Sequence, residues 1–146
     1  MAAYLSTDLA GSANQTSAPV GYKPAATVYG ARLKRLRGLF TYNTQTTSDT
    51  LVIGNLPTGA TVAFGAITTS ASTGSATLAV GITGTTGKYK AAGAVTTTDQ
   101  PQLFGLASAV GGTPLAAEEQ VFVTIAGASL PASGTLVVDL YYSLPN

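Results

Sequence analysis

Four of the seven basic residues lie in one short run, Arg32 to Arg37, with the sequence Arg-Leu-Lys-Arg-Leu-Arg. Cationic groups at this density make charge-assisted hydrogen bonds to carboxylates or to phosphates. The run is therefore a candidate site for an acidic protein surface. Basic side chains also keep the edge strand of a sheet from pairing with other chains, so the run fits a solubilised edge strand as well. Both interpretations remain open from the sequence.

Aromatic residues flank this run on both sides, namely Tyr22, Tyr29, Phe40 and Tyr42. Such rings can stack on unpaired bases, but alternating aromatics in a β protein are more often core or interface anchors. A formal net charge of +1 offers no general attraction to nucleic acid. We therefore predict no nucleic-acid partner, and a protein-binding site made of Tyr22, Lys23, Tyr29, Arg32, Lys34, Arg35 and Arg37.

The side chains that most catalytic and metal sites need are missing. The chain contains no His and no Cys, which removes thiolate nucleophiles, imidazole acid–base catalysis and the common zinc and iron sites. One stretch nearly matches a phosphate-binding loop, but five residues rather than the required four separate Gly81 from Gly87. In addition, Lys88 is followed by Tyr89 where the motif needs Ser or Thr. Ser129 has Gly127 before it but Pro131 where a nucleophile elbow needs a second glycine. The Gly/Thr-rich stretch is instead typical of a hairpin connection.

Glycoside hydrolysis needs only two carboxyl groups, so the absence of His does not exclude it. Glu118 and Glu119 are adjacent and would point to opposite faces of an extended strand. The other acids lie in turn-like sequences, in the N-terminal segment or on an outer strand face. We expect every one of them to be solvated: Asp8, Asp49, Asp99, Glu118, Glu119 and Asp139. The sequence therefore predicts no enzyme, cofactor, metal site or small-molecule substrate.

Length and composition describe a single domain of low charge. The chain has 146 residues, of which 9% are charged, whereas an average globular chain has about 25%. Met1 to Ala10 lacks a basic start followed by an apolar stretch, which argues against a secretory signal. Every apolar run is shorter than the ~18 residues of a membrane helix, so no membrane association is expected. Residues 1–28 show neither helical nor strand periodicity and are predicted to form an extended arm.

Residues 29–146 are predicted to form one all-β domain. Apolar residues alternate with smaller or polar ones at Leu78, Val80 and Ile82, and again in Thr135 to Tyr142. Turn sequences rich in Gly, Pro and Thr separate about eight such segments. The pattern favours a jelly-roll-like antiparallel β-sandwich, with an immunoglobulin-like sandwich as the alternative. The further strands are expected at 39–44, 50–54, 61–69, 91–97, 103–107 and 121–125.

Three strand and turn segments resemble the small β-sandwich virion proteins of tailed bacteriophages. They are Asp49 to Ala60, Thr77 to Ile82 and Leu136 to Tyr142, and the resemblance spans roughly residues 30 to 142. It implies a head decoration or cement protein, commonly a homotrimer, on the outer surface of an icosahedral shell. Its partners would be the major capsid protein and further copies of itself, and it would be made in the host cytoplasm. No catalytic residues come with the resemblance.

A binding module on a tail or head fibre is the main alternative function. Tyr141, Tyr142 and the Thr-rich loops could stack on sugars and hydrogen-bond to them. The absence of Trp weakens this hypothesis, since sugar platforms favour Trp although they can use Tyr. Binding of glycans by the isolated domain would separate the two functions.

Overall fold

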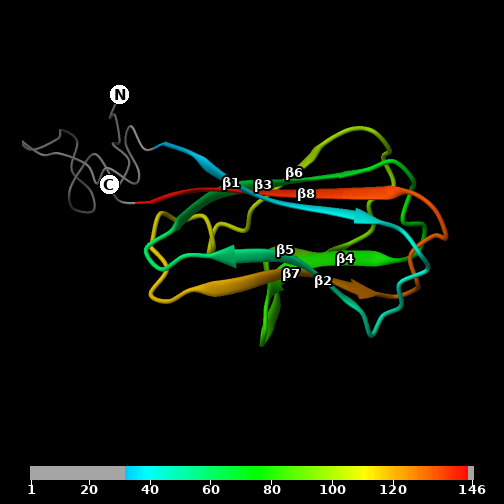
Figure 1. Ribbon diagram of the computed structural model, residues 1–146, viewed down its shortest axis with the longest axis horizontal. Helices are drawn as coiled ribbons and strands as arrows, with labels where there is room; N and C mark the ends of the chain where they lie inside the picture. The colour runs from blue at the N-terminus through cyan, green and yellow to red at the C-terminus, as the bar shows by residue number, and fades with distance from the viewer. Residues whose placement is uncertain (1–31, 145–146) are drawn as a thin grey trace, which may run out of the picture.

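The computed structural model describes residues 32–144, which form an all-β domain of two stacked sheets (Figure 1). The predicted arm, residues 1–28, lies outside the described residues. The eight strands are β1 (Lys34–Thr41), β2 (Thr50–Leu56), β3 (Thr61–Thr69), β4 (Thr77–Ile82), β5 (Thr85–Gly93), β6 (Gln102–Phe104), β7 (Glu119–Ala126) and β8 (Thr135–Ser143).

The strand order is that of a rolled-up hairpin. One sheet has the order β1-β8-β3-β6 and the other β2-β7-β4-β5. Antiparallel pairing joins β1 to β8, β2 to β7, β3 to β6 and β4 to β5, so that the chain folds back on itself about its middle. This order confirms the predicted jelly-roll-like sandwich. The immunoglobulin-like alternative is wrong, because that fold groups its strands as ABED and CFG.

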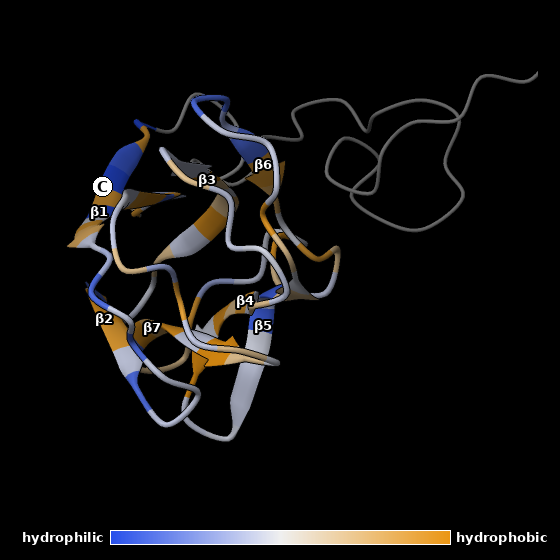
Figure 2. Cartoon of the chain, turned by 90° about the vertical axis from the view of Figure 1, so that its right-hand side faces the viewer, coloured by the Kyte–Doolittle hydropathy of each residue, from blue (hydrophilic) through white to orange (hydrophobic). Residues whose placement is uncertain are grey.

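The core lies between the sheets and is built by alternation along the strands. In β8 the side chains of Leu136, Val138 and Leu140 have no exposed surface, and in β4 the same is true of Leu78 and Val80. Figure 2 looks along the strands and shows the two layers on either side of this core. The inward faces predicted for these strands are therefore confirmed, and burying them supplies most of the drive to fold.

Several strand boundaries differ from the prediction. The first strand begins at Lys34 and ends at Thr41, so it includes most of the basic run, whereas the prediction was 39–44. The predicted strand 91–97 is displaced, because a tight turn at Thr83 and Gly84 lets β5 begin at Thr85. Gly84 has a φ of 81°, a backbone conformation that glycine adopts without steric cost.

β6 is shorter than predicted, and the segment that leads into β7 is irregular. The strand predicted at 103–107 is only Gln102–Phe104, because the chain then turns, with the amides of Ala109 and Val110 donating to the carbonyl of Leu106. The structure shows an irregular approach to β7, tied to β3's entry by hydrogen bonds between Leu115 and both Gly59 and Ala60.

Gly81 in β4 predicts a sharp difference between two glycine substitutions. A Cβ atom at Gly81 would lie 2.2 Å from the backbone oxygen of Thr85 and 2.5 Å from that of Thr86, so the β4–β5 pair would have to separate. Gly81→Ala should lower the free energy of unfolding by about 1–3 kcal/mol. Gly87→Ala, whose nearest neighbour would be 3.6 Å away, should change it by less than about 0.5 kcal/mol. Urea unfolding measures both, and equal effects would contradict the packing described for this hairpin.

Candidate protein-binding face

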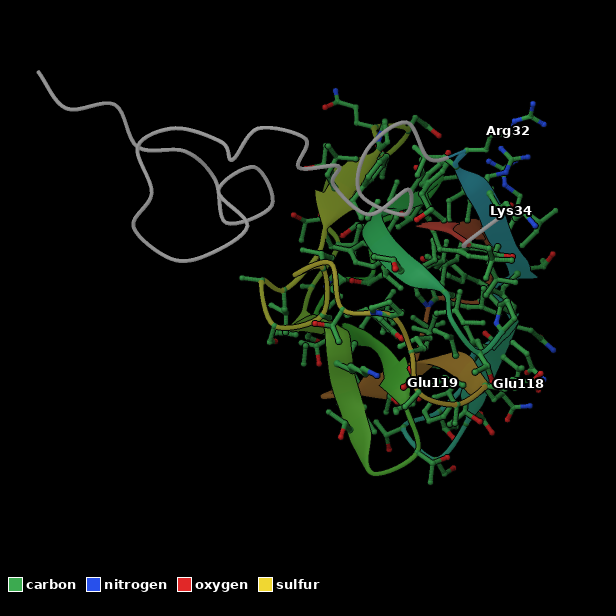
Figure 3. The ribbon with its side chains drawn as sticks, turned by 90° about the vertical axis from the view of Figure 1, so that its left-hand side faces the viewer. Arg32, Lys34, Glu118 and Glu119 are labelled. Carbon is green, nitrogen blue, oxygen red and sulfur yellow. The ribbon has the colours of Figure 1, made fainter. Side chains whose placement is uncertain are left out.

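The described basic residues lie along one edge of the sandwich. Arg32 immediately precedes β1, and Lys34, Arg35 and Arg37 belong to it. All four are exposed, and β1 is the outermost strand of its sheet. Figure 3 shows Arg32 and Lys34 at this edge, and Figure 2 shows hydrophilic residues on β1. Tyr22, Lys23 and Tyr29, which complete the predicted site, lie outside the described residues.

Successive residues of β1 point to opposite faces of the sheet. Leu36 and Phe40 pack against the core, so Arg35, Arg37 and Leu39 lie on the outer face. The side chains of the predicted basic cluster therefore do not all lie on the same face of the sheet. Its position on an edge strand agrees with both sequence interpretations, partner binding and protection of the edge.

Arg37 is held by Asp139, its direct partner across the β1–β8 pair. Its Nε donates to Oδ1 and its Nη2 to Oδ2, each at 2.6 Å, so both carboxylate oxygens are taken. This hydrogen bonding raises the pKa of the Arg37 guanidinium. Arg35 is only loosely engaged, with its Nε 3.9 Å from Oδ1 of the same carboxylate. One arginine is therefore fixed, and the other keeps donors for a further acceptor.

The expectation that Asp139 is solvated is wrong. It lies on the outer face of β8, as predicted, but only 6% of its surface is exposed. β8 is flanked by β1 and β3, so Arg37 and Ala66 stand directly beside Asp139 on either side. Sequence reasoning missed this partner of the basic run. The available signal was a lone acid on the outer face of an apolar strand.

The outer face of the β1-β8-β3-β6 sheet also displays apolar side chains. The ring of Phe64 in β3 stacks on that of Tyr141 in β8, with centroids 4.8 Å apart. Leu39 on β1 and Leu103 on β6 are 68% and 73% exposed. Tyr142 points the other way and packs against the core. Tyr141 and Tyr142 therefore cannot form one sugar platform, the arrangement that the alternative function would use.

A second polar cluster joins β5 to the start of β7. The hydroxyl of Tyr89 donates to Oε2 of Glu119 at 2.5 Å, and Lys88 forms an ion pair with Oε1. Glu119 is half-buried, so the expectation that it is solvated is wrong. Glu118 turns away and accepts a hydrogen bond from Asn55 at 2.7 Å. The two labelled glutamates in Figure 3 belong to this layer of the sandwich, while Arg32 and Lys34 belong to the other.

The Lys88–Glu119 pair lines a pocket of about 300 Å³ beneath the loop that precedes β7. The remaining lining is mostly small or apolar and includes Ala109 and Leu115.

The stretch that nearly matches a phosphate-binding loop is a hairpin, as the sequence favoured. Gly81 lies on β4 and Lys88 on β5, and these two strands are paired.

Four of the five described acids are each bound to a different partner. Asp139 is bound to Arg37, Glu119 to Lys88 and Tyr89, Glu118 to Asn55, and Asp49 to Thr46. Within residues 32–144, no three side chains of the metal-ligating types come together. In the same part of the chain, no helix is long and apolar enough to span a membrane.

No family model matches this chain, and no curated protein does either. Three similar solved structures come from phage capsids. A chain of the cyanophage Pam1 capsid asymmetric unit is 22% identical with a TM-score of 0.65, covering 90% of this chain and 97% of that one. A chain of the Ralstonia phage GP4 capsid is 19% identical with a TM-score of 0.59, covering 80% and 85%. One from the acid-stable capsid of the Helicobacter pylori phage KHP30 is 14% identical with a TM-score of 0.56, covering 78% and 89%. At these identities the likeness establishes the shared fold.

The buried hydroxyl of Tyr89 predicts how stability depends on pH. Burial first, then the hydrogen bond to Glu119 and its charge, raise the pKa of Tyr89 well above its ordinary value. Above pH ~10 the unfolded chain loses this proton while the folded chain keeps it, so the free energy of unfolding falls as pH rises.

Tyr89→Phe should therefore cost about 1–3 kcal/mol at neutral pH, because Glu119 loses a donor, and the cost should shrink in alkali. Urea titrations of both proteins between about pH 8 and about pH 11 measure the difference. Burial lowers the pKa of Lys90, which acts with the opposite sign, but both proteins contain Lys90 and its effect cancels. A cost that stays constant over this range would contradict the assignment.

Proposed function

We propose that the chain is a structural virion protein, not an enzyme, which binds the outer surface of a phage capsid and bridges neighbouring subunits of the major capsid protein. The observation that carries this proposal is the exposed cationic edge, Arg32 to Arg37, on a jelly roll shared with chains of three phage capsids. Acidic groups on the shell would accept hydrogen bonds from these cations. The proposed location is therefore the virion, after synthesis in the host cytoplasm.

Two further parts of this proposal concern assembly. The N-terminal residues 1–28, with Tyr22, Lys23 and Tyr29 close to the basic run, would extend the contact along the shell or onto a neighbouring copy. The protein would act as a homotrimer, as the resemblance to decoration proteins implies. A charged fraction of only 9% supports this part, because interface cores are depleted in charged residues.

Binding to shells is the direct test of the function. The purified chain should co-sediment with mature capsids prepared without it and saturate at a fixed copy number per shell. Raising the salt from about 0.1 M to about 1 M should weaken binding, because the screening length falls from about 10 Å to about 3 Å. Absence of co-sedimentation at low salt would overturn the proposal. Binding to glycans instead would favour the fibre-module alternative.

Deletion of residues 1–28 tests the contribution of the N-terminal segment. The deletion removes none of the eight strands, since β1 begins at Lys34. The shortened chain should keep the circular dichroism and thermal midpoint of the full chain and lose its binding to shells. Shell binding equal to that of the full chain would show that residues 1–28 take no part in it.

A further inference from the structure

The outer face of the β1-β8-β3-β6 sheet has more cations than it can pair within itself. This face carries two cations, Arg35 and Arg37, and its four strands contain one carboxylate, Asp139. Arg37 occupies both oxygens of that carboxylate at 2.6 Å, while Arg35 approaches it only to 3.9 Å. A guanidinium has five N–H donors in a planar fork that matches a carboxylate. Arg35 is therefore positioned to bind a carboxylate from another molecule.

Two exposed leucines lie on the same face of the sheet as Arg35 and Arg37. Leu39 lies on β1 and Leu103 on β6, the two outermost strands of the sheet, and both are more than two-thirds exposed. Leu103 pairs with Ala66, and Ala66 pairs with Asp139, so Leu103 and Arg37 end the same row across the face. Single exposed leucines are ordinary. Here Leu39 follows Arg37 on β1, Leu103 ends the same row as Arg37, and the stacked rings of Phe64 and Tyr141 lie between the two edges, so one face combines charged and apolar groups.

We propose that this face, rather than the outer face of the other sheet, docks on the shell, with Arg35 binding a carboxylate and Leu39 and Leu103 contacting apolar groups. This inference rests on the proposed function and specifies its contact surface and the chemistry of the partner. The partner surface would present a carboxylate and an apolar group to β1, and a second apolar group to Leu103 at the opposite edge of the sheet.

Charge argues for such a partner and against a second copy on this face. Two copies in face-to-face contact would present the same residues to each other. Asp139 is the one carboxylate on these strands, and its oxygens are already taken by Arg37. A second copy would therefore offer Arg35 no carboxylate free of a bound arginine, whereas an acidic shell surface would.

The size of the face sets the expected effect of a substitution. Eight residues of strand extend about 26 Å and four strands span about 19 Å, which gives on the order of 500 Å². A standard interface buries about 800 Å² on each partner. The face would therefore supply a large part of the contact but not all of it. Removing one leucine should weaken binding without abolishing it.

The test compares leucines on this face with a matched residue on the other sheet. Leu39→Ser and Leu103→Ser are made in the full chain, with Val52→Ser as the control, since Val52 is 48% exposed on β2. Co-sedimentation with shells lacking the protein gives the apparent Kd of each variant. We expect the Kd to rise at least about tenfold for each leucine variant and less than about twofold for Val52→Ser. Circular dichroism and thermal unfolding of all three should match the wild-type protein.

Each other result overturns the inference in a recognisable way. If the wild-type chain binds shells and both leucine variants bind equally well, the docking face is wrong while the proposed function stands. If Val52→Ser alone weakens binding, the other sheet is the docking face. If the leucine variants change the sedimentation coefficient of the free protein instead, this face joins copies of the chain. If the wild-type chain does not bind shells, the proposed function fails, and this inference with it.

Discussion

The register of β1 on β8 is the constraint on which the candidate face depends. Arg37 lies opposite Asp139, and their bidentate pair favours this register over a neighbouring one. A slip of one residue would turn Leu36 and Phe40 out of the core and carry Arg35 and Arg37 into it. The same alternation that buries Leu136, Val138 and Leu140 therefore exposes Arg35 and Leu39. Core packing and surface chemistry are set by one strand pairing.

Much of the fold could be predicted because its signals are local. Bulky apolar residues recur at every second position in β4, β7 and β8, and turn residues separate the strands, which was enough to indicate a sandwich of about eight strands. The predicted strand boundaries were wrong where pairing with distant strands or a tight turn sets them. Lys34 to Arg37 is strand because β8 supplies pairing partners. Because a two-residue turn at Thr83 and Gly84 follows β4, β5 begins at Thr85, earlier in the sequence than the predicted strand 91–97.

The candidate site could be predicted only in part. The basic run was visible as a composition anomaly, and its exposure followed from its charge. Its division into a fixed Arg37 and a loosely held Arg35 was not visible, because Asp139 is 102 residues away in sequence. The predicted solvation of Glu119 was wrong for the same reason, because its burial depends on Lys88 and Tyr89, which reach it from β5. The exposure of Leu39 and Leu103 likewise depends on sheet order, which no single segment encodes.

A cryo-EM map of capsids incubated with the purified chain, compared with a map of the bare capsids, tests the central claim most directly. The account predicts added density on the outer surface of the shell, into which the jelly roll fits with the β1-β8-β3-β6 sheet facing the capsid. Arg35 should then lie within hydrogen-bonding distance of an acidic side chain of the shell. Unchanged maps would contradict the virion function, and a jelly roll with the β2-β7-β4-β5 sheet facing the shell would contradict the docking face.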